Sequence, residues 1–235
     1  MILAVLQARC SSTRLPGKVL KPILGTPMLL KQVERIKRSK LIDLLLVATS
    51  VEPSDDQIAQ LCAKHAIDCF RGSLEDVLDR FYQAVERHNP GHVVRITGDC
   101  PLIDPEIIDQ TIELHLRGQY DYTSNCLERT YPHGLDVEVF TAASLEAAWR
   151  EAALPYEREH VTPYLKEHPE LFKIGSLKNS VDLSHLRWTV DYESDYVLVK
   201  RIYESLYQAN PAFTTADILA LLDAKPELSL INQQR

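Results

Sequence analysis

Short apolar segments alternate with amphipathic segments through the first half of this 235-residue chain. This alternation limits the possible folds more than any other feature of the sequence. The apolar segments, rich in β-branched residues, predict strands, and the segments between them predict helices. The predicted strands are Ile2–Leu6, Asp43–Thr49, Ile67–Phe70 and His92–Thr97, and the predicted helices are Pro27–Arg38, Ser54–His65 and Leu74–Arg87. Ser54 is expected to cap the second helix, with Gln57 at the capping-box position. The pattern is typical of an α/β fold with a mostly parallel sheet covered by helices.

The alternation of apolar and amphipathic segments is interrupted between about residues 120 and 175. There, Tyr131–Gly134 predicts a turn, Leu135–Phe140 an alternating strand, and Thr141–Glu151 a helix that begins with a Thr cap. We interpret this segment as an insertion in a single domain that spans residues 1–235. The α/β pattern then resumes with a strand at Leu186–Val190 and helices at Glu193–Gln208 and Thr214–Leu222.

Composition restricts the compartment and the class of ligand. The formal charge is −7 and the pI is near 5.6, which argues against a nucleic-acid partner or an anionic membrane surface. Five cysteines without a C-x-x-C pair predict reduced thiols rather than a disulfide framework or a cysteine zinc site. No apolar stretch approaches the length of a membrane span, and Ile2–Leu6 is too short for a signal sequence. We therefore expect a cytoplasmic protein with a small anionic ligand.

A basic, hydroxyl-rich loop follows the first predicted strand. The segment from Gln7 to Lys18 reads QARCSSTRLPGK and combines backbone N–H groups with fixed positive charge, as a polyphosphate site requires. It is neither a P-loop nor a dinucleotide fingerprint, because Ser12 stands at the first glycine position of the P-loop and no two glycines are two residues apart. An ordinary basic surface turn is the alternative.

Two carboxylates are predicted at the edge of the sheet where open α/β folds bind ligands. Asp99 follows one predicted strand, within RITGDCPL, and Asp191 follows another, within DYESD. One or two carboxylates together with phosphate oxygens commonly hold Mg²⁺, so the pair is a candidate metal site. Alternatively, Asp99 caps a turn before a helix at Pro105–Arg117, while Glu193 and Asp195 are acids that favour a helix start.

These segments together resemble the cytidylyltransferase family that activates sugar acids, which includes the CMP-sialic acid and CMP-3-deoxy-manno-octulosonate synthetases. The resemblance is carried by QAR…STRLPGK from Gln7, RITGDCP from Arg95 and RWTVD from Arg187. The segments YPHGLDVE from Tyr131 and EREHVTPY from Glu157 are most similar to the branch named after spore-coat polysaccharide biosynthesis protein F. This chain departs from the better-known synthetases, which often open with Pro-Ala-Arg followed by Gly.

The resemblance implies a doubly wound fold of the nucleotide-diphospho-sugar transferase type, with CTP and Mg²⁺ as requirements and pyrophosphate as a product. It implies that Arg14 and Lys18 contact the triphosphate, that Asp99 and Asp191 hold the metal, and that the protein is a homodimer joined through the inserted segment. These four residues are the expected catalytic group. The expected nucleotide contacts are Ala8, Arg9, Ser12, Thr13, Arg14, Lys18, Arg95 and Asp99.

The acceptor, a small sugar acid, is expected near the inserted segment. The candidate residues there are His133, Asp136, Glu138, Arg158 and His160. Asp136 and Glu138 share one face of a strand, and Arg158 and His160 suit a substrate carboxylate. Structural roles for the histidines and a solvated helix start around Arg158 are the alternatives.

Three other functions compete with a CTP-dependent transferase acting on a sugar acid. The chain could use another nucleotide or a sugar phosphate, or it could be a non-catalytic nucleotide-binding subunit. The presence of all four expected catalytic residues argues against a non-catalytic subunit. A sugar-nucleotide-dependent glycosyltransferase is disfavoured because such enzymes usually carry Asp-x-Asp, which this chain only approximates at Asp136-Val137-Glu138 and Asp191-Tyr192-Glu193.

Overall fold

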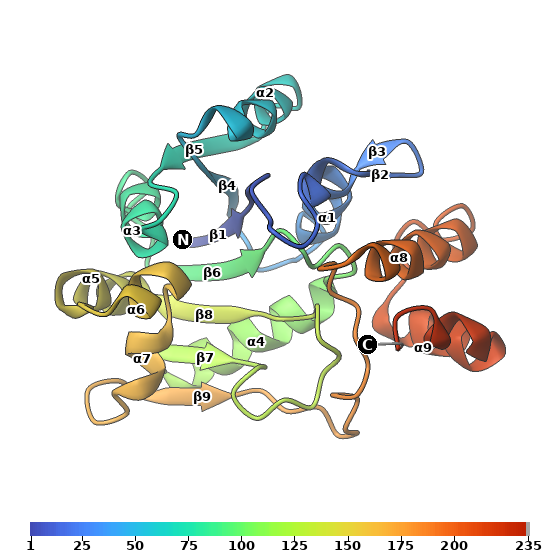
Figure 1. Ribbon diagram of the computed structural model, residues 1–235. Helices are drawn as coiled ribbons and strands as arrows, with labels where there is room; N and C mark the ends of the chain where they lie inside the picture. Colours follow the sequence, from blue (N-terminus) through green and yellow to red (C-terminus); the bar gives the residue numbers. More distant parts are fainter. Residues whose placement is uncertain (234–235) are drawn as a thin grey trace.

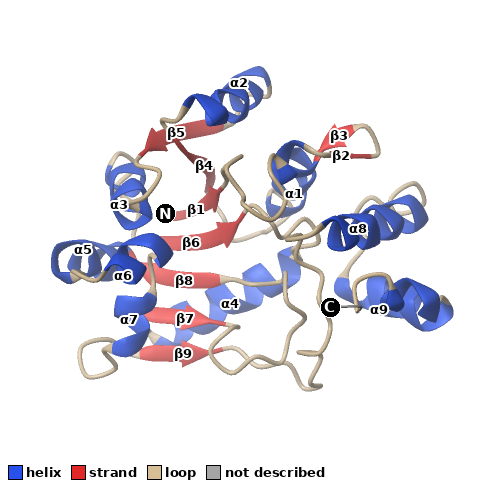
Figure 2. Cartoon of the chain, in the orientation of Figure 1, coloured by secondary structure: helices blue, strands red, loops and turns tan. Residues whose placement is uncertain are grey.

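A seven-stranded, mostly parallel sheet forms the centre of the computed structural model, which describes residues 1–233 (Figures 1 and 2). The strands, in their order across the sheet, are β5 (Asp68–Gly72), β4 (Leu44–Ser50), β1 (Ile2–Gln7), β6 (His92–Thr97), β8 (Glu138–Thr141), β7 (Tyr122–Ser124) and β9 (Ile174–Ser176). β8 runs antiparallel to both of its neighbours, while every other pair in this sheet is parallel. A separate two-stranded hairpin joins β2 (Pro22–Ile23) to β3 (Thr26–Pro27).

Helices cover both faces of the sheet, as a doubly wound fold requires. Side chains of β1 alternate between two cores: Ala4 and Leu6 face one, and Leu3 and Val5 the other. The first core is completed by α1 (Met28–Ile36), α2 (Asp56–Lys64), α4 (Pro105–Gly118), α8 (Glu193–Leu206) and α9 (Thr215–Ala224). The second core is completed by α3 (Val77–Glu86), α5 (Ala142–Glu151) and α7 (Pro163–Glu167), beside α6 (Pro155–His160). The predicted fold class is confirmed.

Local signals located most elements of the fold correctly. The first four strands, their intervening helices and the Thr141 cap of α5 all form, and the Thr141 side chain accepts a hydrogen bond from Ser144 N. Ser54 was wrongly predicted as the cap of α2. It lies instead within a short 3₁₀ helix, Pro53–Asp55, so the α-helix begins later than expected. The segment at residues 120–175 contributes β7, β8 and β9 to the same sheet.

The predicted strand Leu186–Val190 was wrong, because this extended segment does not join the sheet. Among the described residues 1–233, its one β-type pairing is an isolated bridge between Arg187 and His133. Its backbone is satisfied by loops instead: Trp188 N and Thr189 N donate to His133 O at 2.7 and 2.9 Å, and Val190 N donates to Asp99 O at 2.8 Å. The segment therefore runs along the end of the sheet.

A left-handed glycine lets this segment approach the turn at residues 131–134. Gly134 has φ 105°, and a Cβ there would lie 2.4 Å from Thr189 N. Only glycine fits that contact. Within residues 1–233, no helix is long and apolar enough to cross a membrane.

The buried His115 contacts the half-buried His92, and this contact leads to a prediction about the pH dependence of stability. His115 of α4 is fully buried, with Nε2 3.1 Å from His92 Nδ1 and Nδ1 3.0 Å from Thr123 Oγ1. Burial and the nearby His92 lower the pKa of His115 to about 4. Because the unfolded chain takes up protons between pH 6.5 and 4 where folded His115 does not, this contribution to stability is complete above pH 6.5 and is lost as the pH falls toward 4.

We expect His115→Gln to reduce the loss of unfolding free energy between pH 7 and 4 by roughly 1–3 kcal/mol, as measured by urea denaturation. The exposed His65 supplies a matched control, and His65→Gln should keep the wild-type pH dependence. An unchanged pH slope in His115→Gln would show that the buried imidazole does not control acid stability.

Candidate active site

The loop after β1 is closed by its own backbone and fixed to the neighbouring strand. Ala8 N donates to Ala48 O at 3.0 Å, and Gly17 N donates to Cys10 O at 2.9 Å. Gly17 adopts φ 67°, the left-handed conformation that turns the chain into the short helix Lys18–Leu20. These hydrogen bonds and the turn at Gly17 therefore fix the position of the Lys18 backbone at the end of the loop.

Asp55 anchors this loop from a distance in sequence. The side chain is fully buried and accepts hydrogen bonds from Cys10 N at 2.7 Å and Ser50 N at 3.2 Å, together with a short one from Ser50 Oγ. It therefore joins the loop to the end of β4. Sequence reasoning missed this role, because Asp55 stands in an ordinary helix-start pattern and its partner is 45 residues away.

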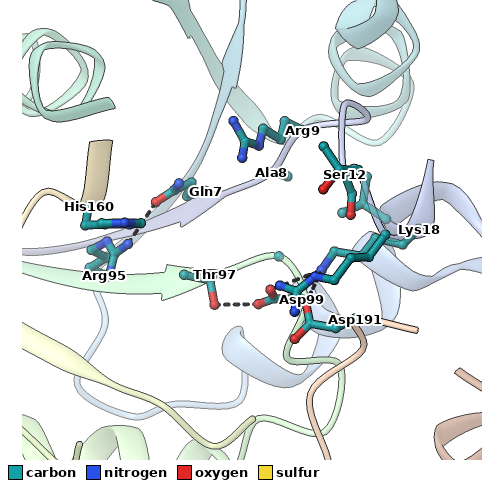
Figure 3. A pocket seen from close by; sticks show the side chains of 14 residues that line it. Gln7, Ala8, Arg9, Ser12, Lys18, Arg95, Thr97, Asp99, His160 and Asp191 are labelled. Carbon is teal, nitrogen blue, oxygen red and sulfur yellow. Dashed lines mark hydrogen bonds and ion pairs between the residues drawn. The ribbon is translucent and has the colours of Figure 1, made fainter. Parts of the chain in front are cut away.

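Lys18 brings the two predicted metal carboxylates together. Its Nζ lies 3.2 Å from Asp99 Oδ2 and 3.0 Å from Asp191 Oδ1, and it donates to Val190 O at 2.7 Å. The lysine is largely buried, so water screens these ion pairs weakly. One ammonium group thus links the loop, the end of β6 and the segment before α8 (Figure 3).

Asp99 follows β6 at a point where two strands converge. Thr97 Oγ1 donates to Asp99 Oδ1 at 2.6 Å and orients the carboxylate. Gly98 N donates to Gln7 O at 2.7 Å, and a Cβ at Gly98 would lie 2.9 Å from that oxygen. The close approach at this glycine is therefore between β6 and β1 of the chain itself.

Asp191 is held by three cations. Besides Lys18, Arg187 Nη2 lies 2.6 Å from Oδ2 and Arg14 Nη2 lies 3.3 Å from Oδ1. Burial opposes ionisation of this carboxyl, but the charge of Lys18 and hydrogen bonds from Arg187 and Lys18 outweigh it and lower the pKa of Asp191 below its ordinary value. The group is therefore an anion at neutral pH, as a metal ligand must be.

A polar cleft of about 290 Å³ opens over these residues. All eight expected nucleotide contacts line it, as do Asp191 and His160. Gln7, Val19, Thr97 and Gly98 also line the cleft, and they were not predicted. They belong to the same two strand ends and the same loop as the predicted residues. Their position next to those motifs in the sequence could have predicted them.

Four of the five expected acceptor residues do not line this cleft. The Arg158 guanidinium lies 2.6 Å from Asp76 Oδ2, and Asp136 Oδ1 lies 2.7 Å from Arg129 Nη1. The Glu138 carboxylate is buried in an ion pair behind Arg95. His133 uses its backbone to hold the segment that leads to Asp191. Of the expected acceptor group, the structure brings only His160 together with the nucleotide contacts.

Comparisons with known proteins identify the family of the chain. The profile of the cytidylyltransferase family matches residues 3–218. The spore coat polysaccharide biosynthesis protein SpsF of Bacillus subtilis is 36% identical over 233 residues, which cover 96% of this chain and 95% of SpsF. A solved cytidylyltransferase from Leptospira borgpetersenii superposes with a TM-score of 0.93 and 36% identity, covering 100% of this chain and 98% of that one.

A more distant structure shares the fold. It is a CMP-2-keto-3-deoxy-manno-octonic acid synthetase in complex with CTP, with a TM-score of 0.67 at 16% identity and coverage of 86% of this chain and 98% of that one. The family match spans nearly the whole chain and includes both strand ends, the basic loop and Asp191. The chain belongs to the cytidylyltransferase family and is a nucleotidyltransferase.

Proposed function

We propose that this protein transfers CMP from CTP to a hydroxyl group of a sugar acid and releases pyrophosphate, in the cytoplasm and for the synthesis of a surface polysaccharide or glycan. The observation that carries the proposal is the meeting of Lys18, Asp99 and Asp191 in one cleft with Arg9 and Arg14 of the loop. The printed names of the relatives support the choice of CTP and of a role in polysaccharide synthesis.

In this mechanism the acceptor hydroxyl attacks the α-phosphorus in line with the departing pyrophosphate. The loop residues Ser12 and Thr13, with Arg14 and Lys18, bind the triphosphate and neutralise its charge. Catalysis of this kind depends on positioning and electrostatics, so no covalent nucleophile is needed.

The cysteines near the site are poor nucleophiles. Burial, together with the charge of Asp55 and a hydrogen bond to it, raises the pKa of Cys10 to about 11, and burial raises the pKa of Cys100 well above its ordinary value. Both thiols are therefore protonated at neutral pH, which agrees with direct attack by the acceptor.

The carboxylates suit Mg²⁺. Asp99 and Asp191 offer hard oxygen ligands, and within residues 1–233 no group of three or more His, Cys, Asp or Glu side chains forms a self-sufficient metal cage. Two carboxylates completed by phosphate oxygens are a common way for Mg²⁺ to bind with a nucleotide. The ion would supply charge neutralisation at the phosphates. Lys18 lies between the two carboxylates and, in this proposal, would turn toward the triphosphate when the nucleotide binds.

Two other functions remain as alternatives: a transferase using another nucleotide or a sugar phosphate, and a binding subunit without activity.

Pyrophosphate release should be measured with CTP, UTP, ATP and GTP against panels of sugar acids and sugar phosphates, with and without Mg²⁺. The proposal predicts release only with CTP, a sugar acid and Mg²⁺. Release with a purine nucleotide, or no release with any pair, would contradict it. Homodimerisation through residues 120–175 stays a prediction.

The carboxylate pair gives a prediction about turnover. Asp99→Asn and Asp191→Asn should each reduce kcat by roughly two orders of magnitude or more, because each removes a charge from the group that organises the triphosphate. Circular dichroism and thermal unfolding should show folded variants. The exposed Asp68→Asn is the matched control, with normal turnover. A folded Asp99→Asn or Asp191→Asn enzyme with near-normal kcat would refute the assignment.

The basic loop gives a prediction about binding. Arg14→Ala and Lys18→Ala should each weaken CTP binding by about 1–3 kcal/mol in calorimetry without an acceptor, since each loses a charge-assisted contact. Arg158→Ala should leave CTP affinity nearly unchanged, because its guanidinium is paired with Asp76 outside the cleft. Normal CTP affinity in both loop variants would show that the triphosphate does not bind at this loop.

A further inference from the structure

Arg95 lies at the end of the cleft opposite Lys18. It stands on β6 four residues before Asp99, which lies in the turn after that strand. Figure 3 shows Arg95 beside Gln7 and His160 at one end, with Lys18, Asp99 and Asp191 at the other. A ligand whose phosphates contact Lys18 therefore has its far end near Arg95.

The Arg95 guanidinium is held in one orientation by the protein. Nη1 forms a short ion pair with Glu138 Oε2, and Nη2 donates to Gln7 Oε1 at 3.3 Å. The side chain is 13% exposed, so it faces the cleft without extending into solvent. A guanidinium carries five N–H donors, and within residues 1–233 these two bonds account for two of them.

Glu138 is fixed in turn by its other neighbours. Tyr122 OH and Thr162 Oγ1 each donate to its Oε1 at 2.6 Å, and Lys166 Nζ lies 3.7 Å from the same oxygen. Burial opposes its ionisation, but Arg95, Lys166 and the hydrogen bonds lower the pKa of Glu138 to about 2. The carboxylate is thus a permanent anchor for Arg95.

Other guanidinium groups lie near Arg95. Arg9 also lines the cleft, while the fully buried Arg80 does not line it and keeps Nε and Nη2 without a partner in residues 1–233. Burial and the charges of Arg9 and Arg95 lower the pKa of Arg80 to about 10, as expected when guanidinium groups lie near one another. A ligand that fits here must present hydrogen-bond acceptors.

We propose that Arg95 recognises the pyrimidine base of the nucleotide and is the residue that selects cytosine over uracil, with Glu138 and Gln7 as positioning residues. Cytosine presents two adjacent acceptors, O2 and N3, to a planar pair of donors. Uracil carries a hydrogen on N3, so the same guanidinium would face a donor and lose one bond. This inference rests on the proposed function, since it assumes that the phosphates bind at Lys18.

The substitution Arg95→Lys tests the assignment while retaining a cation beside Glu138. Calorimetry with CTP and UTP should show that the wild-type preference for CTP falls about tenfold or more, mainly because CTP binds more weakly. Arg14→Ala should weaken both nucleotides equally and keep their ratio. Glu138→Gln should lower the ratio in the same direction as Arg95→Lys, an effect that a general loss of stability would not produce.

A second measurement changes the ligand and starts from the wild-type protein. The triphosphate of 3-deazacytidine, in which C–H replaces N3, should bind the wild-type protein about tenfold more weakly than CTP. In Arg95→Lys that difference should disappear.

An unchanged CTP-to-UTP ratio in Arg95→Lys, or equal wild-type affinity for CTP and its 3-deaza analogue, would overturn the assignment alone. A higher KM for the acceptor at an unchanged ratio would also overturn it and would indicate that Arg95 binds the acceptor's carboxylate. Failure of the wild-type protein to prefer CTP would contradict the proposed function instead.

Discussion

The ammonium group of Lys18 is the interaction on which the site depends. A buried cation is costly unless it is paired and hydrogen-bonded, and here three acceptors from distant segments surround it. Through it the loop after β1 holds Asp99 at the end of β6 and Asp191 before α8. Within residues 1–233, the segment that leads to Asp191 pairs with no strand of the sheet and makes one bridge, between Arg187 and His133 of a turn. The contact with Lys18 and the loop hydrogen bonds therefore fix its place.

Other residues around the site hold the segments that carry Lys18, Asp99 and Asp191 in place. Asp55 ties the loop to β4, and Gly98 lets β6 approach β1 closely enough for both strand ends to line one cleft. His133 and Gly134 bring the segment before Asp191 to the end of the sheet. None of these residues needs to touch a ligand, yet each determines where a charged group lies.

The sequence predicted best what local chemistry determines. Strand and helix periodicity located the first half of the sheet, and the basic loop and Asp99 could be found because a ligand edge follows directly from strand ends. The resemblance to a known family then linked Asp191 to them. All eight expected nucleotide contacts line one cleft, since they belong to two motifs at neighbouring strand ends.

Prediction failed where a side chain is used by a distant part of the chain. Arg158 and Asp136 were predicted to bind the acceptor, but both side chains form ion pairs within the protein. Arg158 pairs with Asp76, and Asp136 pairs with Arg129. Leu186–Val190 has the composition of a strand, yet two loops take its hydrogen bonds. Such pairings depend on tertiary geometry, which neither periodicity nor motif spacing encodes.

Lys18 lies between two carboxylates, which we propose form a metal site. Mn²⁺, a spectroscopic substitute for Mg²⁺, can be titrated into the nucleotide-free wild-type protein and into Lys18→Met, with free Mn²⁺ followed by electron paramagnetic resonance. We predict tighter Mn²⁺ binding to Lys18→Met, because both carboxylates lose their internal cation, and loss of that gain when Asp99→Asn is added. Equal Mn²⁺ affinity in the wild type and Lys18→Met would contradict it.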